Sequence, residues 1–379
     1  MNVPFELSDA IRAGCRDPSD PHIVMAMSGG VDSSVSALLL KRAGYRISAI
    51  FMKNWNEPQG DDGRCQWEDD VGDVLSVCEK LDIPVNTLDL SQAYWDGVFS
   101  EFVDEYRRGR TPNPDILCNR EIKFKAFLNH AAELGGDVIA TGHYAQVNCV
   151  DGVFQLHKGS DSKKDQTYFL YTIGQAALAK TIFPIGGLDK RYVRELATSA
   201  NLSTSAKKDS TGICFIGERR FRTFLSGYLP SRPGPIRSIS GDIIGRHQGA
   251  AYYTIGQREG LGIGGVRGAA KGPWFVVSKN VENNELVAAQ GHNHPLLMSC
   301  SLRADTLSWI GGEPCATPFR CRAKTRYRQI DQYCTIIAIT DGVLTAEFDQ
   351  PQRAVTPGQS VVFYDGNQCL GGGIIDHSE

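Results

Sequence analysis

Between residues 22 and 145, short apolar runs alternate with longer amphipathic stretches, and this alternation restricts the possible folds more than any other feature of the chain. Residues 22–27 form an apolar run that predicts a strand buried on both faces. Residues 31–43 carry apolar side chains at helical spacing, and Gly44 is suited to cap that helix. Further strands are expected at 47–52, 85–90 and 138–141, and further helices at 69–82 and 123–134. Repeated strand–helix–strand units predict an α/β domain with a parallel sheet and right-handed crossovers.

The second half of the chain has a different pattern. Beyond about residue 215 glycine and proline become frequent, and residues 236–290 alternate between short strands and turns. From about residue 291 onward, alternating strands are expected at 319–329, 335–339 and 360–364. Such a set of short strands predicts a small antiparallel β-barrel. A chain of 379 residues has room for two or three domains in all.

Composition argues against several classes of protein. Apolar residues make up 41% of the chain and charged residues 22%, as in soluble globular proteins. No run approaches the ~20 apolar residues that span a bilayer, and the acidic first twenty residues resemble no targeting signal, so we expect a cytoplasmic protein without a membrane partner. The eleven cysteines include no CxxC pair, which argues against a disulfide framework, structural zinc and an iron–sulfur cluster. A net charge of −3 does not indicate a nucleic-acid partner, although clustered basic side chains can bind one locally.

A glycine- and serine-rich segment, residues 28–34 (SGGVDSS), lies between the first strand and the first helix. Two glycines let a phosphate approach the backbone without interference from a β-carbon. The serine hydroxyls and the free N–H groups at the helix start would then bind the anion. Asp32 would face phosphates only with a cation between them, so the sequence predicts Mg²⁺. The alternative is a plain strand–turn–helix junction without a ligand.

Two cysteines lie in segments that favour a reactive thiolate. Cys118 belongs to the stretch 111–120, which is expected to form a rigid loop leading into a helix, and Arg120 lies nearby in sequence. A helix start and nearby cations both lower the pKa of a thiol, and Asp115 could accept or orient a proton. Cys214 follows a glycine and two hydroxyl residues, with two lysines further upstream. A buried structural cysteine is the alternative at both positions.

Basic residues occupy alternate positions of the expected strand 319–329. They are Arg320, Arg322, Lys324, Arg326 and Arg328. Period-two spacing would place all of them on one face of the strand. Because like charges repel unless a polyanion neutralises them, this pattern favours an RNA contact over a solvated strand surface.

A series of blocks along the chain carries a more specific resemblance. In order, they are GVDSSVSALLL, FMKNW, RGRTPNPDILCNREIKF, ATGHYA, KKDQTYFLY, STGICFIG, YYTIGQREGLGIGG, RYRQ and AVTPGQSVVFY. Together they resemble the tRNA-specific 2-thiouridylase family, whose SGGxDS loop is that of the PP-loop ATP pyrophosphatases. The resemblance implies a PP-loop ATP-binding catalytic domain at 1–215, a small central adaptor domain at 216–290, and a tRNA-contacting antiparallel β-barrel at 291–379.

The same blocks imply roles for individual residues. Cys118 matches the catalytic nucleophile, and Cys214 matches the cysteine that receives the persulfide. The contacts implied for the target base are Asn113, Pro114 and Asp115. The contacts implied for ATP are Ala26, Met27, Ser28, Gly29, Gly30, Val31, Asp32, Ser33, Met52 and Gly142. The contacts implied for tRNA are His143, Lys164, Asp165, Gln166, Arg326, Tyr327 and Gln359.

The activity implied by the resemblance is 2-thiolation of the wobble uridine of tRNA. ATP would adenylate the C2 oxygen, and sulfur from a persulfide on Cys214 would then replace it. ATP and Mg²⁺ are the implied cofactors, and tRNA and a persulfide-donating protein are the implied partners. Two alternatives stay open. A PP-loop ligase of the lysidine type would need no thiol, and a noncatalytic RNA-binding or sulfur-carrying protein would release no pyrophosphate.

Overall fold

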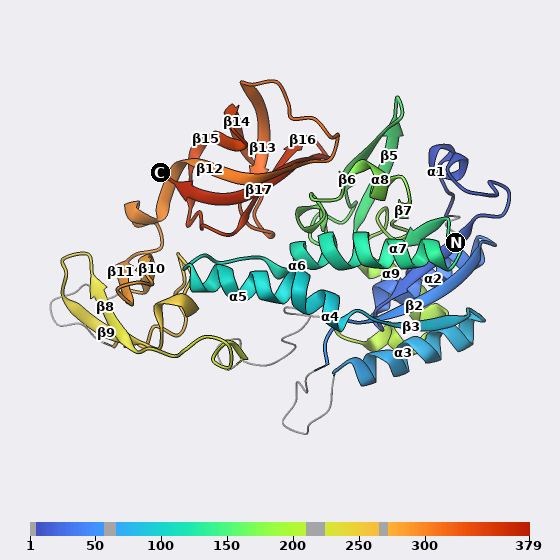
Figure 1. The fold of residues 1–379 in the computed structure, drawn as a ribbon, viewed down its shortest axis with the longest axis horizontal. Coiled ribbons are helices and arrows are strands. Elements are labelled where there is room, and N and C mark those ends of the chain that lie inside the picture. The colour runs from blue at the N-terminus through green and yellow to red at the C-terminus, as the bar shows by residue number, and fades with distance from the viewer. Residues whose placement is uncertain (1–4, 57–65, 210–223, 265–271) are drawn as a thin grey trace.

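The computed structural model describes residues 5–56, 66–209, 224–264 and 272–379. These residues form three sheets, which lie in three parts of the molecule (Figure 1). A five-stranded sheet with its helices forms the N-terminal part, a four-stranded sheet the middle part, and a closed barrel the C-terminal part. The expected fold class, with a parallel N-terminal sheet and an antiparallel C-terminal barrel, is confirmed. Within the described ranges, no helix combines the length and the apolar character needed to cross a membrane.

The N-terminal sheet is parallel throughout, in the order β3-β2-β1-β4-β7. Its strands are β1 (His22–Met27), β2 (Arg46–Lys53), β3 (Val85–Asp89), β4 (Val138–Ala140) and β7 (Thr181–Ile182). In the central strand β1, every residue after His22 is buried, as expected for a strand covered on both faces. The chain continues from β1 to β2 and β3 on one side and returns to β4 on the other. The carboxyl ends of β1 and β4 therefore flank the reversal of strand order, where such sheets bind ligands.

Helices connect these strands and cover the sheet. They are α1 (Asp9–Ala13), α2 (Val31–Arg42), α3 (Gln66–Leu81), α4 (Ser91–Tyr94), the π-helical η1 (Trp95–Phe99), α5 (Ser100–Arg107), α6 (Pro114–Leu117), the π-helical η2 (Cys118–Ala126), α7 (Phe127–Glu133), α8 (Gln175–Leu178) and α9 (Lys190–Ser199). Short 3₁₀ turns are η3 (Thr167–Phe169), η4 (Ser203–Ala206), η5 (Ala250–Tyr252) and η6 (Pro295–Leu297). Gly44 follows α2 with φ +82°, the left-handed conformation typical of a helix end, as predicted.

The N-terminal extension, residues 5–20 before β1, packs against this domain. Leu7 and Ile11 are buried in the core around β1 and α2. The backbone N–H of Leu7 donates to the hydroxyl of Tyr45 at 2.9 Å, and Arg16 pairs with Asp137 at 2.8 Å. The extension is therefore part of the N-terminal domain.

The helical region that contains Cys118 begins earlier than expected. α6 leads directly into η2, and η2 into α7, so the expectation of a loop over 111–120 is wrong beyond Asn113. The side-chain oxygen of Asn113 accepts a hydrogen bond from the N–H of Asp115 at 3.1 Å, and Pro114 takes the first helical position, where its missing N–H does no harm. This cap starts the helix, and Cys118 lies one turn inside it.

The middle sheet has the order β10-β11-β8-β9. Its strands are β8 (Gly234–Ser238), β9 (Ile243–His247), β10 (Trp274–Asn280) and β11 (Glu285–Gln290). The pairing of β8 with β11 is parallel, and the other two pairings are antiparallel. Ile236, Leu286 and Ala288 from this sheet share one hydrophobic cluster with Cys118 of η2. The middle domain therefore packs against the helical region that contains Cys118.

The barrel closes because β12 pairs with both β15 and β17. Its strands are β12 (Met298–Trp309), β13 (Phe319–Lys324), β14 (Gln332–Thr340), β15 (Val343–Arg353), β16 (Ser360–Asp365) and β17 (Gln368–Ser378). A hairpin from the N-terminal part, β5 (Ala145–Val150) with β6 (Val153–Lys158), extends this sheet through Leu156, which pairs with Cys369 of β17. The N-terminal and C-terminal domains thus share a continuous sheet.

β13 ends at Lys324, so the expectation of one strand over 319–329 is wrong. Thr325 explains the early end. Its N–H and its hydroxyl both donate to the side-chain oxygen of Gln329, at 2.8 and 2.9 Å. This local bond replaces the partner that a neighbouring strand would supply, and the chain turns instead of continuing.

Candidate active site

The residues expected to contact ATP lie at the carboxyl edge of the parallel sheet. Ala26 and Met27 end β1, the SGGVDSS loop follows them, Met52 lies in β2, and Gly142 follows β4. Two glycines are required by close packing. Gly29 has φ +73°, and a β-carbon there would lie 2.6 Å from the carbonyl oxygen of Asp70. A β-carbon on Gly142 would lie 2.8 Å from the backbone nitrogen of Ser33.

The start of α2 presents an anion-binding surface. Gly30 occupies the N-cap position, and no side chain caps the helix there. The hydroxyls of Ser33 and Ser34 both donate to the carbonyl oxygen of Gly30, at 3.1 and 2.8 Å. The first N–H groups of a helix have no partner within it, and they carry the positive end of the helix dipole. This surface, with its glycines, fits the phosphates of a nucleotide.

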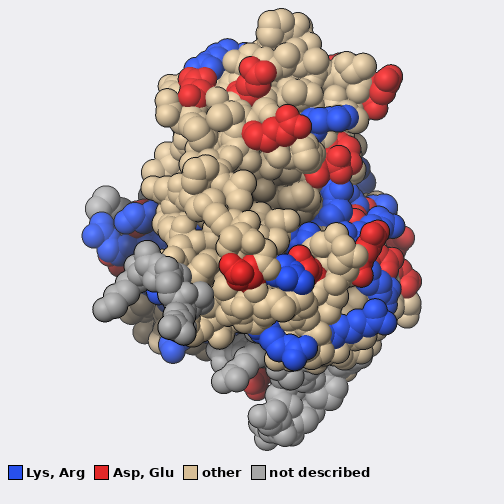
Figure 2. Space-filling model, turned by 90° about the vertical axis from the view of Figure 1, so that its left-hand side faces the viewer, with Lys and Arg blue, Asp and Glu red and all other residues tan. Residues whose placement is uncertain are grey.

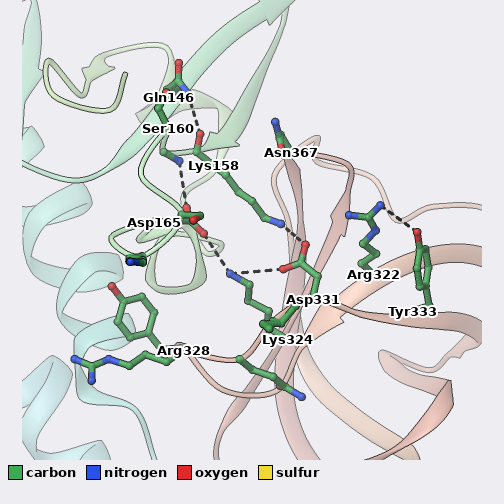
Figure 3. A pocket seen from close by; sticks show the side chains of 16 residues that line it. Gln146, Lys158, Ser160, Asp165, Arg322, Lys324, Arg328, Asp331, Tyr333 and Asn367 are labelled. Carbon is green, nitrogen blue, oxygen red and sulfur yellow. Dashed lines mark hydrogen bonds and ion pairs between the residues drawn. The ribbon is translucent and has the colours of Figure 1, made fainter. Parts of the chain in front are cut away.

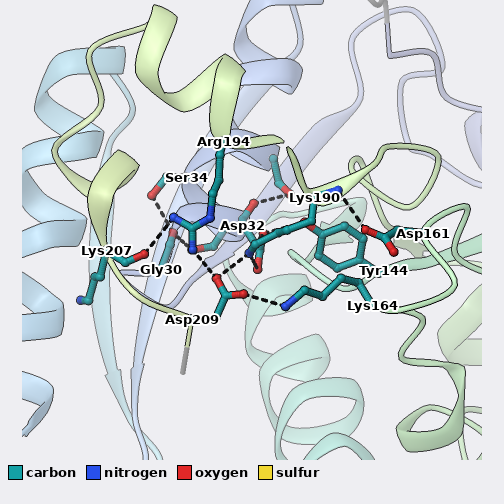
Figure 4. A network of polar contacts seen from close by, with 12 residues as sticks. Gly30, Asp32, Ser34, Tyr144, Asp161, Lys164, Lys190, Arg194, Lys207 and Asp209 are labelled. Atoms are coloured by element: carbon teal, nitrogen blue, oxygen red, sulfur yellow. Dashed lines mark hydrogen bonds and ion pairs between the residues drawn. The ribbon is translucent and has the colours of Figure 1, made fainter. Parts of the chain in front are cut away.

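Asp32, expected to hold Mg²⁺, forms an ion pair with Lys190. The ammonium nitrogen of Lys190 lies 2.7 and 2.8 Å from the two carboxylate oxygens of Asp32 (Figure 4). The hydroxyl of Tyr144 donates to the same carboxylate at 2.8 Å. The Asp32 carboxylate therefore already has a cation, the Lys190 ammonium group, beside it. Carboxylate oxygens are also suitable ligands for Mg²⁺.

Asp209, next to the Asp32–Lys190 pair, forms ion pairs with three basic side chains. Lys164, Lys190 and Arg194 approach its carboxylate at 2.7, 2.9 and 2.6 Å (Figure 4). Burial by itself would raise the pKa of Asp209, but hydrogen bonds and charges from Lys164 and Lys190 lower it to about 2. Asp209 is therefore ionised, and it connects the expected tRNA contact Lys164 to the nucleotide loop through Lys190.

Lys190, Tyr144 and Asp209 were missed by the sequence analysis. They lie far from the loop in sequence and belong to no glycine-rich motif. One signal was available for Lys190, because it follows Asp189, whose side chain caps α9. A lysine in the first turn of a helix is electrostatically unfavourable unless an anion lies nearby.

Cys118 is the first residue of η2 and is only 1% exposed. The neighbouring cation Arg120 pairs with Glu101 and Glu121, at 3.5 and 2.8 Å, and thus has carboxylate partners of its own. π-helical segments are rare and often mark functional sites. Burial raises the pKa of Asp115, with the positive charge of Lys123 acting in the opposite direction. A carboxyl group with a raised pKa holds a proton more readily than an exposed one, which suits it to proton transfer.

Cys214 lies outside the described residues. The nearest described residues on either side are Asp209, in the ion-pair network of the nucleotide loop, and Phe224. Phe224 packs against Trp55 and Phe99, at ring-centroid distances of 6.1 and 5.8 Å, within the hydrophobic cluster that contains Cys118.

A pocket of about 220 Å³ lies between α6 and the barrel. Asn113, Ile116 and Arg120 line it from the helical side, and Tyr171 and Ser360 from the other side. Among the residues expected to meet the target base, Asn113 lines this pocket and Pro114 is buried.

Two of the expected tRNA contacts in the N-terminal domain, His143 and Asp165, are buried. His143 is buried beside Phe124 and Phe183, and burial, followed by the charge of Lys123, lowers its pKa well below the ordinary value, so its imidazole is neutral. Asp165 is also buried, and its carboxylate accepts a hydrogen bond from the hydroxyl of Thr167 at 2.8 Å.

Gln166 also has a partner within the protein. Its side-chain oxygen accepts a hydrogen bond from the N–H of Tyr144 at 3.0 Å. Lys164 is half-buried by its pairing with Asp209. Of the expected contacts in segment 164–166, Lys164 is therefore the residue best placed to meet a phosphate.

The expectation that five basic side chains share one strand face is wrong. Arg320 forms a two-point ion pair with Asp349, and Arg322 donates to the hydroxyl of Tyr333 at 3.1 Å. Lys324 is buried and lies 3.4 Å from Asp165. Arg320 and Lys324 thus have acidic partners in the same chain, and Arg322 contacts the neutral side chain of Tyr333.

Arg326 follows the end of β13 and joins two domains. Its guanidinium donates to the carbonyl oxygens of Ile255, in the middle domain, and Ala354, in the barrel, at 3.1 and 2.9 Å. The ring of Tyr327, the other expected contact in this turn, packs on Phe169 with centroids 4.3 Å apart. Arg326 is therefore a structural link in this conformation.

A cleft of about 890 Å³ separates the N-terminal hairpin and its following loop from this part of the barrel (Figure 3). Lys158 and Lys324 converge on Asp331 across it, and Arg322 and Arg328 line it as well. Basic side chains are also visible on the face formed by the barrel and the middle domain, where they lie mainly toward one edge with acidic ones among them (Figure 2).

Comparison with known families matches all three parts of the chain. The model of the tRNA methyl transferase HUP domain matches residues 21–218, and the model of the tRNA methyl transferase PRC-barrel domain matches 222–290. The model of the aminomethyltransferase beta-barrel domain matches 299–375.

Relatives in Francisella resemble the chain over nearly its whole length. The protein named tRNA-specific 2-thiouridylase MnmA from Francisella tularensis subsp. holarctica is 58% identical over 93% of this chain and 98% of its own. The protein of the same name from subsp. novicida is 57% identical over the same shares. A solved NMN synthetase from Francisella tularensis covers 53% of this chain and 71% of its own, with 18% identity and a TM-score of 0.33. The identity of the full-length relatives and their near-complete coverage show that this chain belongs to the tRNA-specific 2-thiouridylase family.

Proposed function

We propose that this chain catalyses the ATP-dependent 2-thiolation of the wobble uridine of tRNA. The observation that carries the proposal is the SGGVDSS loop at the strand-order reversal of the sheet, in a chain 58% identical to a protein named tRNA-specific 2-thiouridylase. The loop supplies Gly29, where a β-carbon would clash with the backbone of Asp70, and an uncapped helix start suited to phosphate.

Adenylation is the first step. A uridine C2 oxygen is a poor leaving group, so it must first be converted into a better one. The C2 oxygen attacks the α-phosphorus of ATP, the bond between the α and β phosphates breaks, and pyrophosphate leaves. The start of α2 and the hydroxyls of Ser28 and Ser33 are suited to hold the phosphates, and Asp32 to hold Mg²⁺, which would neutralise charge on the departing pyrophosphate.

Sulfur transfer is the second step and uses the two matched cysteines. Cys214 carries the outer sulfur as a persulfide. The thiolate of Cys118 attacks the inner sulfur of that persulfide, a Cys118–Cys214 disulfide forms, and hydrosulfide leaves with the outer sulfur. Hydrosulfide adds to C2 of the adenylated uridine, and AMP departs. A reductant must then supply two electrons to reopen the disulfide.

Asp115 is suited to manage protons during these steps. It lies one helical turn from Cys118, and burial raises its pKa, so it can hold a proton at a pH at which an exposed carboxyl could not. Cys118 is buried in the described conformation, so tRNA binding must expose its thiol to the persulfide. The pocket of about 220 Å³ that Asn113 lines offers space for the target base beside this helix start.

We further propose that tRNA binds across the N-terminal domain and the barrel, with Lys164, Tyr327 and Gln359 among its contacts. A persulfide-donating protein would load Cys214. The experiment incubates unmodified tRNA with the protein, ATP, Mg²⁺ and a persulfide source, and then identifies the nucleosides by mass spectrometry and the nucleotide products by chromatography. We expect 2-thiouridine, AMP and pyrophosphate. Formation of ADP and phosphate, or of lysidine in place of 2-thiouridine, would contradict the proposal.

A further inference from the structure

Two cysteines face each other across neighbouring strands of the barrel. Cys321 in β13 pairs directly with Cys334 in β14, and their sulfur atoms lie 3.6 Å apart. Directly opposed residues of antiparallel strands have Cα atoms about 4.5–5.5 Å apart, which lies within the range of about 4.4–6.8 Å that a disulfide spans. The two side chains are thiols in contact, and the backbone holds them at a separation that suits a disulfide.

The surroundings of this pair suit an uncharged bond between the two sulfurs. Both side chains belong to the hydrophobic cluster inside the barrel, where Cys321 is 5% exposed and Cys334 0%. The contact with Cys334, followed by burial, raises the pKa of Cys321, so its thiol stays protonated. A disulfide carries no charge, so its formation buries no new charge in this apolar cluster. The cluster can therefore hold the pair in either redox state.

A third cysteine connects the pair to the surface. Cys315 lies before β13, is partly exposed, and packs against the cluster that contains Cys321 and Cys334. Burial, followed by the charge of the nearby Cys321, raises the pKa of Cys315. A thiol that reaches both solvent and the buried pair is positioned to exchange disulfides between them. Cys315 therefore gives a small disulfide a route to Cys321 and Cys334.

We propose that Cys321 and Cys334 form a reversible redox site, which a small disulfide such as glutathione disulfide oxidises through Cys315. The site is separate from the cysteines of the proposed sulfur transfer, because Cys118 belongs to η2 and to another hydrophobic cluster. Its oxidation requires neither ATP nor tRNA. The inference therefore goes beyond the proposed function and does not depend on it.

Oxidation proceeds by successive thiol–disulfide exchanges. The Cys315 thiolate attacks one sulfur of glutathione disulfide, which releases one glutathione and leaves the other bonded to Cys315. Cys321 then attacks the Cys315 sulfur and releases the second glutathione. Cys334 attacks the Cys321 sulfur, forms the Cys321–Cys334 disulfide and returns Cys315 to its thiol. The net result is that Cys321 and Cys334 give up two electrons and two protons, and one glutathione disulfide becomes two glutathione thiols.

The test maps disulfides in the full, folded chain after incubation with glutathione disulfide and alkylation of the remaining thiols. Trypsin cuts between the two cysteines, so that only a disulfide keeps their peptides together; the cleavage sites are Arg322, Lys324, Arg326 and Arg328. We expect mass spectrometry to find the peptides of Cys321 and Cys334 linked, and dithiothreitol to separate them. Cys300 is exposed and should instead gain one glutathione, which shows that the oxidant has reacted.

Single substitutions separate the buried pair from its entry thiol. Cys334→Ser should lose the linked peptides entirely. Cys315→Ser should form the same link severalfold more slowly and to the same final extent, because the oxidant must then reach a buried sulfur directly. Cys300→Ser, which removes an exposed thiol outside the cluster, is the matched control and should form the link at the parental rate.

The folded parent decides the inference without any substitution. Peptides of Cys321 and Cys334 that stay separate while Cys300 carries glutathione would overturn it. A link that forms only when urea unfolds the chain would also overturn it, because the folded barrel would then keep the two sulfurs from bonding. Formation of the link in Cys315→Ser at the parental rate would overturn the route through Cys315.

Discussion

The side-chain amide of Gln359 donates a 2.7 Å hydrogen bond to the carbonyl oxygen of Thr111, which ties the barrel to the chain just before the helix of Cys118. The N–H of Thr111 in turn donates to the carbonyl oxygen of Pro357 at 2.9 Å. The barrel therefore clamps Thr111 on both sides. Gln359, matched in sequence to a tRNA contact, has this positioning role in the described conformation.

Loss of this clamp should disturb catalysis more than nucleotide binding. Gly358 has φ +89°, and a β-carbon there would lie 2.7 Å from the backbone nitrogen of Thr111. We expect Gly358→Ala to lower the free energy of unfolding by about 1–3 kcal/mol and to reduce the thiolation rate. Gln359→Ala removes one hydrogen bond and should cost about 0.5–1.5 kcal/mol. Urea unfolding, single-turnover thiolation and ATP binding would measure the three quantities.

Gly342→Ala is the matched control for Gly358→Ala. Gly342 also has a left-handed backbone, with φ +76°, but a β-carbon there would meet no atom within 4 Å. It should share the backbone strain of Gly358→Ala and lack its clash with Thr111. Equal thiolation rates in the two variants would show that the clamp does not position the helix of Cys118.

Arg326 and Arg320 should differ in what they support. Arg326 donates to Ile255 and Ala354 from a partly buried position, so Arg326→Ala should lower the free energy of unfolding by about 2–4 kcal/mol. Arg320 lies at the surface beside Asp349, and Arg320→Ala should leave the urea midpoint nearly unchanged. An unfolding midpoint equal to that of the parent for Arg326→Ala would show that Arg326 does not stabilise the contact between the domains.

Salt dependence of tRNA binding should identify the basic residues that contact phosphate. Arg322 and Arg328 line the cleft between the domains. If each neutralises one phosphate, each alanine variant should reduce the log–log slope of affinity against salt by about one unit. Arg320→Ala, whose charge is neutralised by Asp349, serves as the control and should keep the parental slope. Unchanged slopes for Arg322→Ala and Arg328→Ala would mean that tRNA binds elsewhere.

Lys279 should make stability depend on alkaline pH. Burial lowers its pKa from the ordinary value of 10.5 to about 8, while its ammonium group donates to the carbonyl oxygen of Tyr253 at 2.7 Å. Between pH 8 and 10.5 the unfolded chain therefore binds more protons at this site than the folded chain. The contribution of Lys279 to the free energy of unfolding should rise with pH in this window, by at most about 1.4 kcal/mol per pH unit.

The difference between the parent and Lys279→Met isolates this contribution from other groups that titrate in the same range. Urea unfolding of both proteins at several pH values from 7 to 10 measures it. A difference that stays constant with pH would contradict the lowered pKa of Lys279.

Local patterns predicted much of the fold. The strand at β1, the helix α2 and its Gly44 cap follow from short-range hydrophobic spacing and backbone preference, and the structure confirms them. The helix start at Asn113 was missed because Pro112 and Pro114 suggested a loop, although Pro114 suits a first helical turn. The basic strand was misjudged because Thr325 donates hydrogen bonds to the side-chain oxygen of Gln329, and the strand ends at Lys324.

Contacts between residues far apart in the sequence explain the features of the site that the sequence analysis did not predict. Lys190 meets Asp32 across 158 positions of the chain, and no local pattern reports such a contact. Similarly, the partner of Arg320 is Asp349, on another strand of the barrel. A charge pattern shows which side chains need a partner, and tertiary structure decides whether that partner belongs to the same chain or to an RNA.

The central claim is that Cys118 and Cys214 carry sulfur to an adenylated uridine. Its most direct test is mass spectrometry of nucleosides from unmodified tRNA incubated with ATP, Mg²⁺, a persulfide source and the parent, Cys118→Ser, Cys214→Ser or Cys300→Ser protein. Cys300 is exposed and serves as the control. We expect 2-thiouridine with the parent and Cys300→Ser, none with the other two variants, and AMP and pyrophosphate as the products of ATP. Thiolation at the parental rate by either Cys118→Ser or Cys214→Ser would contradict the account.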